Sequence, residues 1–353
     1  SLTAFPAPPI LPARGASLTS MPGKDEIAIE VLPRLETVLS DRWPIHVVPA
    51  RDELLSSWLH RIALAHGLSP RRFGASLGFE ERTWSARLDN AAPDWLFEFL
   101  YTRTGLPVDR IASMTSGFEP WHPLALSMRW RTHRSRATWL QFCPSCLAED
   151  KQPYFRRRWR RATFIVCPTH QIGLIDRCTA CGSGIVSCDE RAVVPQHRCA
   201  ECGFDLRRAK GIVLSKAARR ASKLLDGLVA AECARGILSE SSLIEQILEL
   251  PSLLRPTHEV KFTSLSSRAR LRCLDKLNAS LDKHLMRDPN PRIAAWRRSI
   301  IMSGGPYSSL EPLISKLTES LNRKKRPRNP RGRDIQEIDL PQLLLAYRDL
   351  ASR

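Results

Sequence analysis

Apolar residues recur at helical spacing over most of the first 128 residues. The clearest stripe begins near Asp52 and consists of Leu54, Leu55, Trp58, Leu59, Ile62 and Ala65. This spacing predicts an amphipathic helix that Gly67 ends as a left-handed cap. Ser69 and Pro70 then supply the N-cap and first-turn proline of a second helix, which closes at Gly78. Two helices joined by so short a turn indicate a helix-turn-helix, although a helical hairpin with no DNA-binding role has the same pattern.

The periodicity continues toward the C-terminus with one long interruption. It predicts helices over 94–104, 107–114, two within 212–250, 267–284, 291–302 and 340–350. Ser242 and Glu245 fit a capping box for the second helix of the 212–250 stretch, and Pro251 interrupts the pattern after it. From about residue 130 to 208 helical spacing fails and cysteines dominate.

Seven of the ten cysteines and one histidine form four pairs with two residues between the members. The pairs are Cys143 with Cys146, Cys167 with His170, Cys178 with Cys181, and Cys199 with Cys202. This spacing lets a tight turn present two side chains to one ion, and sets rich in thiolate select zinc. Sequential pairing gives a Cys₃His site and a Cys₄ site, two Zn²⁺ per chain; interleaved pairing uses the same residues. Cys188 and His197 are alternative ligands in the last gap.

Together these patterns predict a mainly α protein with a zinc-bound centre. The N-terminal helical domain contains the helix-turn-helix, a double zinc-finger module follows, and the C-terminal region is helical. We place a mobile tail with a short helix at 1–42, the helix-turn-helix domain at 43–130, the tandem zinc-finger module at 131–210, and the C-terminal helical region at 211–353, with a basic loop at 323–333.

The chain has 353 residues and a formal net charge of +18. No apolar run approaches the roughly 18 residues of a membrane span, and residues 1–23 do not resemble a signal peptide. We therefore expect a cytoplasmic, nucleoid-associated protein, in which cysteines are metal ligands rather than disulfides. An excess of cations favours a nucleic-acid partner.

Two short stretches carry most of that excess. The stretch 129–161 has ten basic and two acidic residues, and the stretch 323–333 has seven basic residues and no acid, which leaves the rest of the chain close to neutral. Arginine suits bidentate phosphate contacts. The alternative interpretation of both stretches is that their charges are simply solvated at the surface and bind no partner. The predicted nucleic-acid contacts are Arg129, Arg131, Arg134, Arg136, Arg156, Arg157, Arg158, Arg160, Arg161, Arg323, Lys324, Lys325 and Arg326.

Several of these segments resemble the TniQ family. The stretch from Glu53 to Ala63 is similar to that family's N-terminal signature, with Leu54 where the family usually has serine. The stretch from Phe142 to Asp150, Pro153-Tyr-Phe-Arg-Arg157, Trp159 and Val166-Cys-Pro-Thr-His170 resemble its zinc-finger core, and the resemblance runs from about 43 to 205.

The resemblance implies a non-catalytic adaptor of DNA transposition. TniQ-like proteins connect a DNA target, directly or through a guide-RNA complex, to a AAA+ ATPase that recruits the transposase. Independently, the sequence holds no phosphate-binding loop or nucleophile elbow, and ligand sets completed by protein leave no catalytic zinc position. We therefore predict no enzymatic activity, with DNA and the ATPase as partners, a transposase or guide-RNA complex as further ones, and homodimerisation as an option. The alternative function is a zinc-containing helix-turn-helix transcription regulator.

Overall fold

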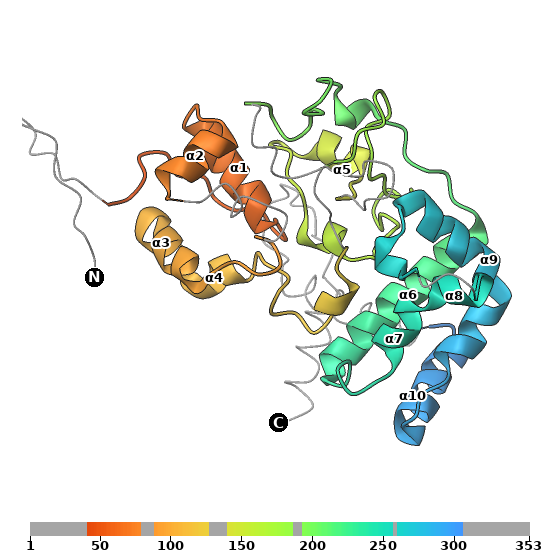
Figure 1. The fold of residues 1–353 in the computed structure, drawn as a ribbon. Coiled ribbons are helices and arrows are strands. Elements are labelled where there is room, and N and C mark those ends of the chain that lie inside the picture. The colour runs from red at the N-terminus through yellow and green to blue at the C-terminus, as the bar shows by residue number, and fades with distance from the viewer. Residues whose placement is uncertain (1–40, 79–87, 127–139, 186–192, 257–259, 306–353) are drawn as a thin grey trace, which may run out of the picture. The chain divides into compact units, whose positions relative to one another are not determined.

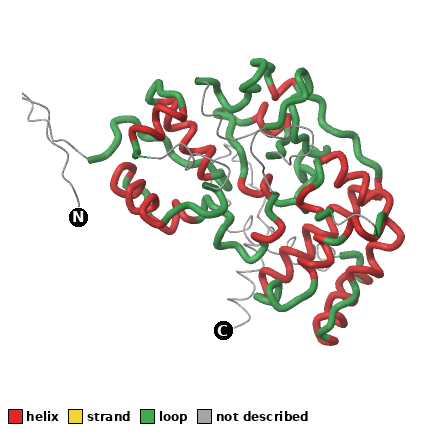
Figure 2. Tube along the Cα trace, in the orientation of Figure 1, coloured by secondary structure: helices red, strands yellow, loops and turns green. Residues whose placement is uncertain are grey.

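The computed structural model describes residues 41–78, 88–126, 140–185, 193–256 and 260–305. These belong to a unit that begins at Asp41, separate from Ser1–Ser40. The predicted tail, Arg129 to Arg136, Cys188, the basic loop and the last predicted helix lie outside the described residues. Within the described part the fold is mainly helical, as predicted, and contains isolated antiparallel bridges but no strand (Figures 1 and 2).

The N-terminal helices are α1 (Leu55–Ala65), α2 (Pro70–Ser76), α3 (Asp94–Thr104) and α4 (Val108–Ala112). The predicted start of the first helix near Asp52 is three residues early, because Asp52 has a φ of 58° and cannot continue a right-handed helix. Gly105, with a φ of 72°, ends α3 as a left-handed cap. Trp58, Phe73 and Leu100 belong to the core that these helices share.

The central segment consists mostly of loops with short helical turns. These are η1 (His122–Leu124), α5 (Pro144–Glu149), η3 (Arg157–Arg160) and η4 (Leu206–Arg208). Phe142, Phe155 and Trp159 are buried in a second core, together with Cys143, Cys167, Cys178 and Cys199. Phe155 and Trp159, which lie next to arginines in the sequence, therefore pack this core.

The C-terminal helices form the third core. They are α6 (Lys216–Arg235), α7 (Leu243–Leu248), α8 (Leu250–Leu254), η5 (Phe262–Ser264), α9 (Ser267–Leu285) and α10 (Pro291–Met302). The helical pattern is interrupted near Pro251, as predicted: α7 ends at Leu248, and Pro251 lies in the first turn of the separate helix α8, where a missing N–H costs nothing. Trp121 and Ile165, from outside these helices, complete this core.

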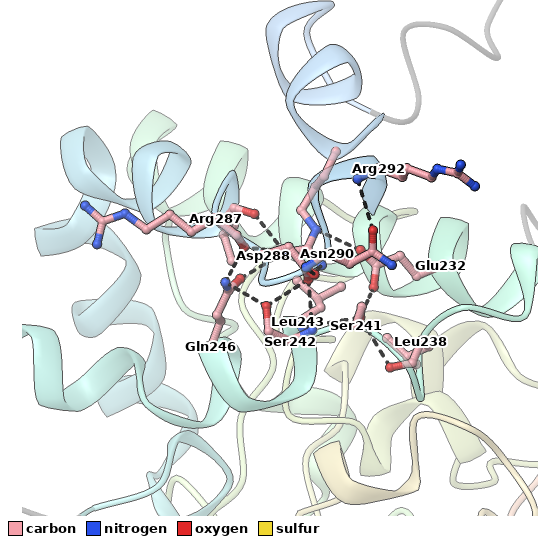
Figure 3. Close-up of polar contacts among 12 residues, drawn as sticks. Glu232, Leu238, Ser241, Ser242, Leu243, Gln246, Arg287, Asp288, Asn290 and Arg292 are labelled. Atoms are coloured by element: carbon pink, nitrogen blue, oxygen red, sulfur yellow. Dashed lines mark hydrogen bonds and ion pairs between the residues drawn. The ribbon is translucent and has the colours of Figure 1, made fainter. Parts of the chain in front are cut away.

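The predicted capping box at α7 does not form. Ser242 makes no side-chain cap; its hydroxyl donates to Asp288 Oδ2 at 2.8 Å, and its backbone N–H donates to the same oxygen at 2.9 Å (Figure 3). A carboxylate from the loop between α9 and α10 thus replaces the local cap. The tertiary contact is preferred because Asp288 is also held by a buried arginine.

That arginine, Arg297 on α10, is fully buried between two carboxylates. Its Nε lies 2.8 Å from Glu232 Oε1 and its Nη2 lies 3.0 Å from Asp288 Oδ2. Burial raises the pKa of Glu232, against the opposing effect of Arg297. The network fixes α10 and the preceding loop against α6 and α7, because breaking one partner of such a pair leaves a buried charge.

Candidate metal centres and the arginine cluster

Two groups of side chains could each hold a metal ion, and they follow the sequential pairing. The first site is Cys143, Cys146, Cys167 and His170, and the second site is Cys178, Cys181, Cys199 and Cys202; within each, the candidate ligand atoms lie within 4.8 Å of one another. The interleaved pairing is therefore not the one the fold adopts. Neither group includes His197, one of the alternative ligands.

In the first site, His170 Nδ1 lies 3.4 Å from each of the three sulfurs. Cys143 precedes α5 and Cys146 lies within it, so a single helical turn aims both thiols at one point. The loop from Cys167 to His170 closes from the opposite side, and Gln171, with a φ of 53°, turns the chain away after it. The opposite nitrogen of the imidazole, Nε2, lies 2.7 Å from Glu149 Oε1. Such a carboxylate orients a metal-binding histidine and raises its basicity.

The second site is built from two turns that repeat each other. Cys178 and Cys199 each begin the sequence Cys-x-x-Cys-Gly, and Gly182 and Gly203 have φ values of 73° and 71°. Gly182 N–H donates to Cys178 C=O at 2.9 Å, and Gly203 N–H donates to Cys199 C=O at 2.8 Å. The repeated Arg-Cys-x-x-Cys-Gly was visible in the sequence as a signal for two equivalent turns. Burial raises the pKa of the Cys199 thiol, and a metal would bind it as the thiolate.

The donor sets and their spacing fit a tetrahedral ion. The sulfurs of Cys178 and Cys202, and those of Cys181 and Cys199, lie 3.7 Å apart. A tetrahedron with metal–sulfur bonds of about 2.3 Å has edges of roughly that length. Three thiols with an imidazole, and four thiols, suit a soft divalent ion and are poor ligands for magnesium or calcium.

The arginine cluster (Arg156, Arg157, Arg158, Arg160 and Arg161) lies beside the first site, and every member contacts an acidic side chain of the same chain. Arg156 binds both oxygens of Asp150 at 3.1 and 2.7 Å and covers the rings of Tyr154 and Trp159. The remaining acids are distant in sequence: they are Asp52, Asp89, Glu119 and Asp226.

Arg160 is a core residue. It is 1 % exposed, and its Nη1 lies 3.8 Å from the buried carboxylate of Asp89. Asp89 also accepts from the Ser56 N–H at 2.9 Å and the Ser56 hydroxyl at 2.8 Å. Burial raises the pKa of Asp89, and Arg160 opposes that rise. Arg160 was predicted to lie on a surface that faces DNA, but it is buried inside the protein. There it connects the cluster to α1 through Asp89.

A buried polar junction that no sequence pattern predicted joins α1 to the central segment. Glu53 Oε2 lies 2.6 Å from Arg61 Nη1, and the Ser57 hydroxyl is shared between Glu53 Oε1 at 3.0 Å and Gln196 Oε1 at 2.8 Å. Ser57 Oγ also accepts from the Phe155 N–H at 3.0 Å. Burial raises the pKa of Glu53, with Arg61 opposing it. Polar residues just before and within α1, such as Glu53 and Ser57, therefore join this helix to the central segment. No local sequence pattern reveals this contact.

A second junction attaches α9 to the central segment. The fully buried Arg270 donates to Ala162 C=O at 3.0 Å and Gln141 Oε1 at 3.1 Å. Asp176, two residues before the second site, accepts from the Ser267 N–H at 2.9 Å. Burial lowers the pKa of Arg270 to about 10, with Asp176 opposing the shift.

Residues 44–174 match the model of the TniQ family. The matched range includes α1 to α5, the arginine cluster and the whole first site; it ends before the second site. No curated protein matches the chain.

Proposed function

We propose that this chain is a non-catalytic target-selection adaptor of DNA transposition, on the premise that its residues 44–174 match the TniQ family. In this role it binds target DNA, or a guide-RNA complex, and recruits a AAA+ ATPase and through it the transposase. The family match is the observation that carries the proposal. No helix in the described part of the chain is long and apolar enough to cross a bilayer.

The metal at both sites is zinc in this proposal, and its role is structural. Each site offers four protein ligands, so a bound zinc keeps no open position for a reacting water. The first site holds α5 and the loop 167–170 together beside the arginine cluster. The second fixes the two repeated turns whose outer residues, such as Ala180 and Ala200, face solvent. Zinc thus supplies rigidity to surfaces that other macromolecules contact.

The adaptor function is tested by measuring insertion in cells that supply the cognate transposase, the ATPase and a marked element. We expect insertion at the preferred target to fall to background without this chain, while transposase abundance is unchanged. Cys143→Ser is expected to behave like the deletion, and Cys233→Ser, at a half-buried cysteine outside both sites, like the wild type. Unchanged insertion frequency and target choice in the deletion would contradict the proposal.

A pull-down of the ATPase in nuclease-treated extract separates direct recruitment from tethering through DNA. Recovery of the ATPase with the wild-type protein supports a protein–protein contact, and loss of the complex on nuclease treatment contradicts it. The transcription-regulator alternative draws support from α1 and α2, which are joined at Gly67 and leave Arg72 of α2 exposed. It predicts regulation of a promoter in cells that lack the transposase and the ATPase.

A further inference from the structure

The outward side of α6 is entirely basic over its first two turns. Every exposed residue from 216 to 223 is a cation: Lys216, Arg219, Arg220 and Lys223. Their spacing of three, four and seven residues places them on one side of the helix. The residues between them, including Ala218, Ala221 and Leu224, are buried in the C-terminal core.

A second basic stripe follows α9. Arg268, Arg272, Lys276 and Lys283 are all exposed, and at 3.6 residues per turn they fall within an arc of about 80°. The opposite side of α9 buries Leu271, Leu274 and Leu281. From Arg268 to Lys283 the stripe extends for about 22 Å, at 1.5 Å per residue.

The two stripes border the same seam because α6 and α9 lie side by side (Figure 1). Ser215 Oγ donates to Asp275 Oδ1 at 2.5 Å, and further along both helices Arg220 Nη2 lies 2.5 Å from Asp282 Oδ2. Both contacts advance in the same direction, so the helices are parallel. We call the eight cations of the two stripes the α6/α9 basic face.

Among the described residues, few acids lie near this face. Asp275 and Asp282 are the acids that the described part of the chain places at the seam, and Asp282 is paired with Arg220. Across the described residues, no ion pair involves Lys216, Arg219, Arg268, Arg272, Lys276 or Lys283.

The helix termini add to this potential. Neither α6 nor α9 has an acidic residue in its first turn, where Lys216 and Arg268 lie instead. The N-terminus of a helix carries a partial positive charge, so cations there are unfavourable for folding. Lys216 and Arg268 therefore add to the positive potential at the two helix N-termini although they disfavour folding there. Among the described residues, no ion pair compensates for this cost.

The types of side chain exposed on α6 and α9 limit the classes of ligand that this face can bind. Neither α6 nor α9 has an exposed large apolar residue among those described, so the face offers no ring for stacking on bases and no anchor for a protein interface. Two rows of cations, one about 22 Å long on α9 and one about 10 Å long on α6, match an array of phosphates better than a compact anion.

We propose that the α6/α9 basic face binds the phosphate backbone of duplex DNA. The inference rests on the proposed function for its choice of DNA, and adds the surface that makes the contact, which lies outside the matched domain. It requires contacts to phosphates on either side of the helix seam and no reading of base sequence.

The test compares two triple variants of the full-length, zinc-loaded protein. The face variant is R268Q/R272Q/K276Q, and the control is R287Q/R292Q/R298Q, whose three arginines are also exposed. Figure 3 shows the guanidinium groups of Arg287 and Arg292 pointing away from the buried network around Asp288. Both variants remove three positive charges from the same total, so a difference between them reports position rather than net charge.

Binding to a labelled 25-base-pair duplex of random sequence is followed by fluorescence anisotropy from 50 to 300 mM salt. We expect the face variant to bind about tenfold more weakly at 100 mM salt. Its slope of log affinity against log salt should become shallower by about 0.9 for each phosphate that the protein no longer neutralises. The control should retain at least half of the wild-type affinity. Thermal unfolding of each variant verifies that it is folded.

The outcomes separate this inference from the proposed function. If the wild type binds duplex DNA and the two variants weaken it equally, the face is not the contact, and the adaptor function stands. If the face variant keeps wild-type affinity for duplex DNA but no longer binds single-stranded RNA or the ATPase, the ligand assignment is wrong. If the wild type binds no duplex under any of these conditions, this inference fails, and insertion assays alone decide the adaptor function.

Discussion

The arginine cluster and the α6/α9 basic face are both rich in cations, but the acids around them differ. Around the cluster, Asp52, Asp89, Glu119 and Asp226 arrive from distant parts of the chain and neutralise it. On the face, the described residues place two acids, Asp275 and Asp282, at the seam beside eight cations. A run of arginines in sequence is therefore not by itself evidence of an uncompensated basic surface, because the fold can bring acids to it.

Loss of the bound metal is expected to have the largest effect on stability, and it should act on the region of the arginine cluster. Binding of structural zinc contributes about 10–16 kcal/mol in small domains. Cys143→Ser should therefore disorder the central segment and release the arginine cluster from its acids. Urea unfolding and elemental analysis measure this, with two zinc ions per chain expected in the wild type from the two sites. Cys233→Ser is the control, and zinc content below two in the wild type would contradict the pairing.

Arg160→Gln comes next and distinguishes a structural arginine from a DNA-binding one. Because it leaves Asp89 buried without its cation, we expect a loss of about 3–5 kcal/mol in unfolding free energy. Combining it with Asp89→Asn should recover part of that loss. The salt dependence of DNA binding should not change. Reduced DNA affinity at unchanged stability would place Arg160 among the functional contacts.

The pH dependence of stability gives a second, smaller test of the Arg160–Asp89 pair. Burial raises the folded-state pKa of Asp89 above its usual value, so the folded protein binds this proton more tightly than the unfolded chain. Its contribution to stability is greatest below the unfolded pKa, near 3.9, and declines as pH rises through the folded value. The stability of the wild type relative to Asp89→Asn should decline over that window by at most about 1.4 kcal/mol per pH unit. A relative stability that rises with pH there would contradict the assigned direction.

The smallest change in stability is expected from variants of the basic face, and this change should be an increase. Lys216→Gln and Arg268→Gln remove cations from helix N-terminal turns, so each should stabilise the protein by about 0.3–1 kcal/mol. Chemical unfolding of the two variants, with Arg292→Gln beside them as an exposed reference, measures this. Destabilisation by more than about 1 kcal/mol would mean that the face has a folding role.

Helix positions and the metal-ligand pairs were largely predictable because they depend on local spacing. The range predicted at 94–104 is that of α3, since the stripe and Gly105 are both local signals. The grouping of the cysteine pairs required the fold, since spacing alone allows two arrangements. Ser242 fitted a capping box, but Asp288, 46 residues later, takes its hydroxyl.

Charge compensation was the main feature that local patterns could not supply. Counting within 129–161 found two acids, although Asp52 and Asp226 lie outside that window and contact the cluster. The basic face did leave a sequence signal that was overlooked. Seven cations and no acid lie between Asp205 and Asp226, and four of them have helical spacing. A sum over consecutive residues does not show this spacing, because buried residues such as Ala218 and Ala221 lie among the four cations along the helix.

The junction at Arg270 has a consequence for how this protein can be divided. Gln141 and Ala162 lie inside the matched range, yet their polar atoms are satisfied by Arg270, about 100 residues beyond its end. Ser57 likewise depends on Gln196. A fragment cut at residue 174 would expose these groups to water, and a chimera that exchanges the C-terminal helices would bury them without partners. The smallest portable piece of this chain is therefore larger than its family domain and extends at least through α9.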